Sequence, residues 1–322
     1  MDALLIMLRN VLLFVALAIP GYLLVRCGQM KQEQSGALSK LLMYVGMPFL
    51  ILGSTINNLS FNKELLLTLG VVAVVGVAYT FLMFLASAPL TAATGEEKTR
   101  GMMRFSSVFS NNGFLGIPLA MAVFGADSPI MTVLILLNII TNVMMYTLGA
   151  YLVSGDKSKM NLRKAFLNPV LIAFVVGIVL NLINVKSYVP EVATYSTHFS
   201  NLVTPISMTI LGMKMGAIKI TSLFSSPRTY YVSALKLILF PAVIVAALLA
   251  VRAIPAVTVV DNAMVLGFFI ALAMPTAGLA STFADSFGGD TENAVAFTLG
   301  TTLLSIVTIP VFYWLLCLCL GI

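Results

Sequence analysis

Long apolar stretches alternate with short polar connections along the whole chain of 322 residues. A helix that crosses the hydrocarbon core of a bilayer needs about 20 mostly apolar residues. By this length the chain contains ten predicted spans: 4–27, 36–57, 65–90, 102–124, 129–153, 168–186, 199–217, 228–252, 262–285 and 293–320. The pattern therefore predicts an all-α polytopic membrane protein.

The fourth predicted span contains a polar run within an otherwise apolar sequence. Residues 109–118 include two adjacent amides, a hydroxyl, two glycines and a proline. Gly and Pro destabilise a helix interior by roughly 1 and 3 kcal/mol. Non-helical backbone at membrane depth persists only where protein or a water-filled cavity covers it. We therefore expect a broken helix that lines a site.

The ninth predicted span carries a comparable interruption at residues 275–278. The second and seventh spans also share weak motifs in the same order, ending in Ile51-Leu52-Gly53 and Ile210-Leu211-Gly212. Two halves of five helices have opposite orientations, because five is odd. We predict two inverted five-helix repeats, 1–155 and 169–322, joined by a central loop at 156–168. Interrupted helices at matching places in two halves point to a transporter site.

Composition and charge narrow the class further. The chain is 60% hydrophobic and 9% charged, whereas soluble proteins carry roughly 25% charged residues. The net charge of +6 comes from Lys and Arg in the short connections, so it does not form a stripe for nucleic acid, and no nucleic-acid partner is expected. The lipid bilayer is the expected surrounding.

Lys and Arg are distributed unequally between the two sides of the membrane. The connections after the first, third, fifth, seventh and ninth spans hold the larger set: Arg26, Lys31, Lys40, Lys98, Arg100, Arg104, Lys157, Lys159, Arg163, Lys164, Lys214, Lys219 and Arg228. The opposite side holds Arg9, Lys63, Lys186 and Arg252. The richer side is expected to be cytoplasmic. This orientation puts the loop 154–168 in the cytoplasm and both termini outside.

The two interruptions are expected to lie at the same depth, because the fourth and ninth spans run in opposite directions. Each break leaves unpaired N–H groups at the start of the following half-helix, and such ends favour an anion. Amide side chains at the break offer both donors and acceptors. The predicted binding residues of the two breaks are Ser110, Asn111, Asn112, Gly113, Pro275, Thr276 and Ala277. The alternative is that these amides only hold helices together.

The fifth predicted span adds a polar stripe. Asn138 and Asn142 are four residues apart and share a helix face. Thr141 lies beside them, and Tyr146 continues the stripe by one turn. Polar side chains in a span usually face the interior of the bundle. We include these four residues among the binding residues, with contact between helices as the alternative.

Charged side chains within the spans are candidates for coupling. An ionisable residue inside a span is a functional hypothesis by default. Lys236 lies two turns inside the eighth span, although its long side chain could also extend to the membrane surface. Asp285 lies at the end of the ninth span, where it could serve a proton or a cation. Lys214 is interpreted as an orientation charge, and His198 as a solvated loop residue.

Enzyme chemistry is not indicated. A single histidine excludes an HExxH metal motif. No Gly-rich loop ends in Gly-Lys-Ser/Thr, so this chain has no ATP-binding signature. The cysteines Cys27, Cys317 and Cys319 lack metal or redox spacing. We therefore expect no catalytic residue, no metal site and no cofactor, and leave coupling to sodium or protons open.

Several motifs together resemble the auxin efflux carrier family. They are Phe109-Ser-Asn-Asn-Gly-Phe-Leu-Gly-Ile-Pro-Leu with Phe124-Gly125, Ala273-Met-Pro275-Thr-Ala with Phe287-Gly-Gly-Asp290, and Leu303-Leu-Ser305 with Pro310. The resemblance implies ten helices in two inverted repeats, with a fold related to bile-acid symporters and sodium/proton antiporters. It also implies a scaffold of helices 1, 2, 6 and 7, over which helices 3–5 and 8–10 move as an elevator. A homodimer through the scaffold is implied as well.

Individual positions match this family unequally. Asn111 matches the crossover asparagine and Pro275 the crossover proline of the ninth helix, whereas Ser110 stands where plant carriers have a second proline. The span 65–90 lacks the charged residues of plant carriers, and the central loop is short. These departures favour a bacterial or archaeal member, and we expect the bacterial inner membrane.

The leading hypothesis is a secondary transporter of a small organic anion, such as malate, malonate or an auxin-like acid. Two alternatives stay open at this point. The first is a sodium- or proton-coupled symporter or antiporter of another solute. The second is a membrane sensor that carries no flux.

Overall fold

The computed structural model describes residues 2–58, 63–125, 128–217, 226–254 and 258–322. Within these ranges all regular elements are helices, and Ser110 and Thr276 form an isolated antiparallel bridge. Six of the described helices are long and apolar enough to cross a membrane, and three shorter ones are also apolar. The predicted all-α polytopic class is confirmed, while the ten-helix inverted repeat stays a prediction.

The first half of the chain forms eight α-helices. They are α1 (Asp2–Arg26), α2 (Ser35–Leu41), α3 (Met47–Asn58), α4 (Lys63–Thr91), α5 (Glu97–Val108), α6 (Ile117–Phe124), α7 (Pro129–Met144) and α8 (Ala150–Ser154). Three π-helical turns belong to the same spans: η2 (Leu42–Gly46), η3 (Asn112–Gly116) and η4 (Met145–Gly149). Gly155, with a φ of 69°, ends α8 in the left-handed conformation that glycine adopts without strain.

The second half begins with short helices and ends with the longest one. Its α-helices are α9 (Leu162–Phe166), α10 (Pro169–Leu182), α11 (Val185–Tyr188), α12 (Glu191–Ser200), α13 (Val203–Gly216), α15 (Pro227–Ala234), α16 (Phe240–Arg252), α17 (Asn262–Ala273), α18 (Ala280–Phe287) and α19 (Thr291–Leu320). A π-helical turn, η6 (Leu235–Leu239), joins α15 to α16. Lys219, one of the predicted cytoplasmic charges, lies outside the described residues.

The predicted seventh span, 199–217, contains α13, and a further helix that the prediction did not include precedes it. The helical segment begins at Glu191 with α12, and α13 follows it from Val203. Residues 191–200 contain Glu, Ser, Thr and His side chains, most of which are exposed. A window of apolar residues therefore missed this helix, because six of its ten residues are polar.

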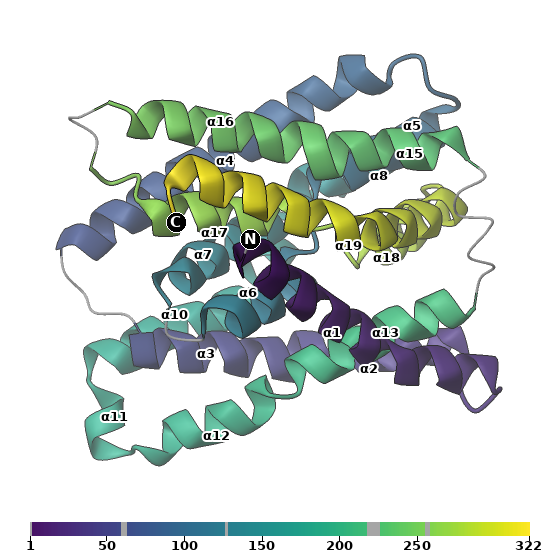
Figure 1. Ribbon diagram of the computed structural model, residues 1–322. Helices are drawn as coiled ribbons and strands as arrows, with labels where there is room; N and C mark the ends of the chain where they lie inside the picture. Colours follow the sequence, from purple (N-terminus) through teal and green to yellow (C-terminus); the bar gives the residue numbers. More distant parts are fainter. Residues whose placement is uncertain (1, 59–62, 126–127, 218–225, 255–257) are drawn as a thin grey trace.

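The helices form two packed sides. α1 packs along α13, and α3 packs against α10 and α12; we call this group the α13 side. α7 packs against α4 and α17, α16 against α17, and α5 against α19; we call this group, with α6 and α18, the α17 side. In Figure 1, α11 and α12 lie along one edge of the molecule and α4 and α16 along the opposite edge. The broken helices lie between these edges.

Glycines bring α1 and α13 into close contact. A Cβ atom added to Gly212 would lie 1.9 Å from the carbonyl oxygen of Ala18, and one added to Gly21 would lie 2.0 Å from that of Thr209. Gly216 follows Gly212 after one turn and also lies close to α1. Small residues at this spacing allow membrane helices to pack backbone against backbone. The sequence therefore dictates an unusually close helix pair on the α13 side.

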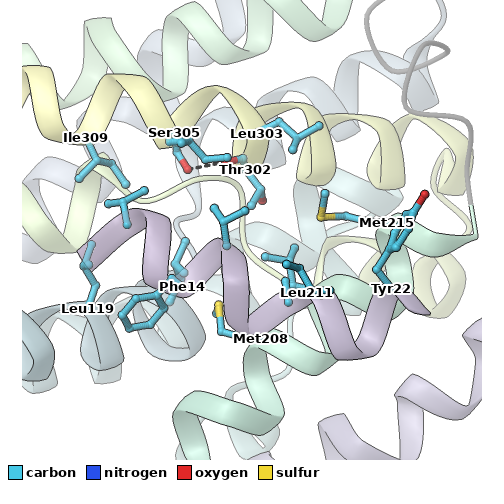
Figure 2. Close-up of a pocket in the computed structure, with 16 residues that line it drawn as sticks. Phe14, Tyr22, Leu119, Met208, Leu211, Met215, Thr302, Leu303, Ser305 and Ile309 are labelled. Carbon is cyan, nitrogen blue, oxygen red and sulfur yellow. Dashed lines mark hydrogen bonds between the residues drawn. The ribbon is translucent and has the colours of Figure 1, made fainter. Parts of the chain in front are cut away.

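The contact between the two sides is largely apolar. Figure 2 shows a cavity of about 130 Å³ that α1 and α13 line from one side, and α6 and α19 from the other. Phe14, Met208, Leu119 and Ile309 are among its lining residues. The Ser305 hydroxyl donates to the Thr302 carbonyl within α19, so it makes no bond across the cavity. We call this contact the apolar seam.

Candidate functional site

The helix of the fourth span breaks at the predicted place. α5 ends at Val108, and Phe109 is extended, with φ −93° and ψ 124°. Ser110 pairs with Thr276, and helical structure resumes at Asn112. The break therefore forms without a proline at position 110.

The ninth span breaks at the same level, and the two breaks pair with each other. α17 ends at Ala273, and α18 begins only at Ala280. The Asn111 N–H donates to the Pro275 carbonyl at 2.7 Å, and the Ala277 N–H donates to the Phe109 carbonyl at 2.9 Å. These bonds satisfy backbone groups that the interrupted helices leave unpaired. We call the paired segments 109–111 and 274–279 the crossover.

Thr276 attaches the crossover to two neighbouring helices. Its hydroxyl donates to the Ser106 carbonyl at 2.9 Å, and its N–H donates to the Thr301 hydroxyl at 3.1 Å. Thr276 is fully buried. The sequence did not predict the contact of Thr301, on α19, with the crossover. This contact depends on how α19 packs against the break of the ninth span.

We expect Thr276→Val to lower the free energy of unfolding by about 1–3 kcal/mol, because the Ser106 carbonyl loses a buried donor while the side-chain volume hardly changes. Thermal unfolding of the purified protein in detergent measures this loss. Thr197→Val, which removes an exposed hydroxyl bonded within its own helix, is the matched control. Equal melting temperatures for the two variants would contradict the attachment.

Four predicted site residues form a network of amides and a hydroxyl. The Asn138 amide donates to the Asn112 side-chain oxygen at 2.9 Å, and the Asn112 amide donates to the Thr141 hydroxyl at 3.1 Å. The Asn142 amide donates to the Asn138 carbonyl at 2.8 Å. A Cβ atom at Gly113 would lie 2.7 Å from the Asn138 amide nitrogen, so the close contact needs glycine there. For these residues the geometry favours a bracing role.

Asn111 differs from these bracing amides. Its side chain is half-buried and makes no side-chain hydrogen bond within the part of the chain that the structure describes. Asn111 lines two adjoining cavities at the crossover. One of them, the crossover cavity, is also lined by predicted site residues: Ser110, Asn112, Gly113, Asn138, Thr141, Asn142 and Ala277. The Asn111 amide is therefore available to a ligand.

Lys236 lies beneath the crossover and does not extend to the membrane surface. Its side chain is 1% exposed, and its Nζ donates to the Ser110 hydroxyl at 2.5 Å. The residue belongs to η6, and π-helical turns occur frequently at functional sites. Lys236 therefore places a basic side chain directly behind the crossover cavity.

Lys214, interpreted from the sequence as an orientation charge, also contacts the crossover. Its Nζ donates to the carbonyl of Gly278, within the crossover, at 3.0 Å. Lys214 also lines the second cavity together with Asn111. The position of Lys214 near the end of the seventh span did not predict its contact with Gly278, because the direction of a long side chain depends on the neighbouring helices.

The predicted residues Asp285, Tyr146 and Pro275 do not line the crossover cavity. Asp285 is exposed and accepts a hydrogen bond from the Thr291 hydroxyl at 2.6 Å. Tyr146 lines a separate cavity of about 630 Å³, which also includes Arg163 of the central loop. Pro275 contributes its carbonyl to the crossover backbone but does not line the cavity.

The larger cavity, here called the vestibule, shares two lining residues with the crossover cavity. Met43 and Asn168 line both. Asn168 caps the start of α10, because its side-chain oxygen accepts from the Val170 N–H at 2.9 Å. The Asn-Pro sequence at 168–169 is a helix-start signal, but it did not indicate a cavity.

Comparisons of the sequence with known proteins point to membrane transport proteins. A family model described as membrane transport protein matches residues 6–162 and 155–313. An uncharacterized transporter of Methanothermobacter thermautotrophicus is 26% identical over 310 residues, which cover 94% of this chain and 96% of the relative. An uncharacterized transporter of Methanocaldococcus jannaschii is 26% identical over 211 residues, which cover 64% of this chain and 68% of that relative.

Proposed function

The chain belongs to the membrane transport proteins of the auxin efflux carrier family, and from this premise we propose that it moves a small organic anion across the membrane by alternating access. The observation that carries the proposal is the Asn111 amide at the crossover, which forms no side-chain hydrogen bond with the described residues and lies near Gly278 and Ser110, the residues that Lys214 and Lys236 contact. A carboxylate such as malate, malonate or an auxin-like acid is the proposed substrate class.

The charge around the crossover supports an anion. Lys214 and Lys236 both donate to crossover residues. Among the residues that the structure describes, no Asp or Glu lines the crossover cavity or the adjoining one. In addition, the helix that begins at Asn112 directs its first N–H groups toward the break, and such helix ends favour negative charge. Basic side chains without acidic partners stabilise an anion at this place.

The vestibule supports alternating access. Arg163, Leu167 and Asn168 of the central loop line it, so in this proposal the anion enters from the side that the charge distribution predicts to be cytoplasmic. The apolar seam supports an elevator movement, because contacts without directional bonds can shift register at low cost. In this proposal the α13 side is the scaffold and the α17 side is the moving domain. A homodimer through the scaffold also stays a prediction, which the mass of the detergent-solubilised protein tests.

Asn111→Ala is expected to reduce counterflow of labelled malonate, malate or phenylacetate in proteoliposomes by about tenfold to a hundredfold. A hydrogen bond to a charged group contributes about 1.5–3 kcal/mol, and 1.4 kcal/mol corresponds to a factor of ten. The melting temperature of the variant should not change, because the Asn111 side chain forms no hydrogen bond with any described residue.

Asn201→Ala is the matched control for this experiment. Asn201 is exposed at the end of α12 and lines neither the crossover cavity nor the adjoining one. Wild-type transport by Asn111→Ala would contradict the binding role of Asn111. A wild-type protein that binds and transports none of the three acids would contradict the proposed substrate class.

A further inference from the structure

We propose that Lys214 supplies the positive charge that recognises the transported anion from the scaffold, and that its hydrogen bond to Gly278 is the resting contact of the unoccupied site. This inference rests on the proposed function and assigns the charge recognition to a residue outside the moving domain. It predicts that the anion and the Gly278 carbonyl compete for the same ammonium group.

The position of Lys214 connects the two sides of the molecule. Lys214 belongs to α13, and its Nζ crosses to the carbonyl of Gly278 in the break of the ninth span. Gly278 also neighbours Asn111, since a Cβ atom added to it would lie 3.5 Å from the Asn111 amide nitrogen. The ammonium group and the available amide therefore converge on one residue of the crossover.

The hydrogen-bond capacity of Lys214 is only partly used. An ammonium group has three donors, and the structure shows one of them on the Gly278 carbonyl. No carboxylate of the described residues forms an ion pair with Lys214. The adjoining cavity that it lines with Asn111 is otherwise bordered by hydroxyl groups and apolar side chains: Ser39, Ser207, Thr298 and Thr302, with Phe114 and Leu211. The remaining N–H groups can therefore serve a ligand in that cavity.

Electrostatics favours exchange of partners when an anion arrives. A charged group within a membrane protein is costly unless it is paired, and a carbonyl compensates an ammonium group less well than a carboxylate does. A carboxylate at Asn111 would lie next to Lys214 and would gain a charge-assisted hydrogen bond from it. The ammonium group would then leave Gly278 or share its donors with the ligand.

This exchange links occupancy to the contact between the two sides. In the unoccupied site, the Lys214–Gly278 bond is a polar contact beside an otherwise apolar seam. In the occupied site, the same ammonium group binds the anion, so the backbone contact between scaffold and moving domain is weakened. Lys236 cannot replace Lys214 in this role, because Lys236 lies on the α17 side and moves with the crossover.

The test measures dissociation constants of malonate, malate and phenylacetate for the purified full-length protein by isothermal titration calorimetry. Lys214→Met should weaken binding of the acid that the wild type binds best by at least tenfold. Lys214→Arg keeps the charge and should bind within about threefold of the wild type. Lys214→Gln keeps a donor for the Gly278 carbonyl without the charge, and should behave like Lys214→Met.

Lys40→Met is the matched control. It removes an exposed positive charge that, like Lys214, belongs to the predicted cytoplasmic set. Wild-type affinity in Lys214→Met overturns the inference and leaves the proposed function intact. Wild-type affinity in Lys214→Gln also overturns the inference. A neutral donor to the Gly278 carbonyl would then suffice, and the contact between residue 214 and Gly278 would be structural. A wild-type protein that binds none of the three acids overturns the proposed function, and this inference with it.

Discussion

A Gly212→Val variant is expected to lose the close pairing of α1 and α13 and to melt at least several degrees below the wild type. The first side-chain carbon would lie 1.9 Å from the Ala18 carbonyl oxygen and 2.8 Å from the Tyr22 backbone nitrogen. These are backbone atoms of a neighbouring helix, so no side chain can rotate away. Overpacking in a core costs about 1–3 kcal/mol, and a forced shift of two helix backbones lies at the upper end.

Thermal unfolding in detergent, followed by circular dichroism, measures this effect. Gly70→Val is the matched control, because a Cβ atom on Gly70 in α4 meets nothing within 4 Å. The control should melt close to the wild type. If the two variants lost equal stability, the glycine contact between α1 and α13 would not be the cause.

An Asn112→Leu variant is expected to lose transport and also about 2–4 kcal/mol of unfolding free energy. The substitution removes an acceptor from the Asn138 amide and a donor from the Thr141 hydroxyl. Asn112 is 2% exposed, and Asn138 and Thr141 are buried as well. Each unsatisfied buried polar group costs about 1–3 kcal/mol. Because Asn112 directly follows Asn111, loss of the network also shifts the proposed ligand contact.

A double-mutant cycle with Asn138→Leu separates this network from general damage to packing. When both partners are replaced by apolar groups, no amide is left unpaired between them. The double variant should therefore lose clearly less stability than the sum of the two single variants, by about 1 kcal/mol or more. Additive losses would contradict direct coupling between Asn112 and Asn138.

The long apolar helices could be predicted from the sequence because a helix that crosses a bilayer must be apolar over its thickness. The breaks could be predicted because Gly, Pro and adjacent amides oppose a continuous helix. Helix α12 was missed apart from its last two residues, since six of its ten residues are polar. The pairing of Asn111 with Pro275 agrees with the expected meeting of the two breaks, which lie 164 positions apart in the chain (275 − 111).

The sequence predicted which amides lie together, but it did not predict the contacts of the charged residues, and the binding role of the amides stays a prediction. The structure brings Asn111, Asn112, Asn138 and Asn142 around one cavity. It places Asp285 at an exposed position instead. A charge in a sequence has a position along its helix but no direction, so the contacts of Lys214 and Lys236 could not be derived from spacing.

The sequence by itself therefore determined the all-helical membrane class, the long apolar helices, the two breaks and the amides near them. These features follow from local physical chemistry: hydrophobic length, helix propensity and the periodicity of one helix face. Only the tertiary structure decided which amides brace and which one stays available, and which lysine contacts which break. Those choices depend on the packing of residues far apart in the chain, where a shift of one side chain changes its hydrogen-bond partner.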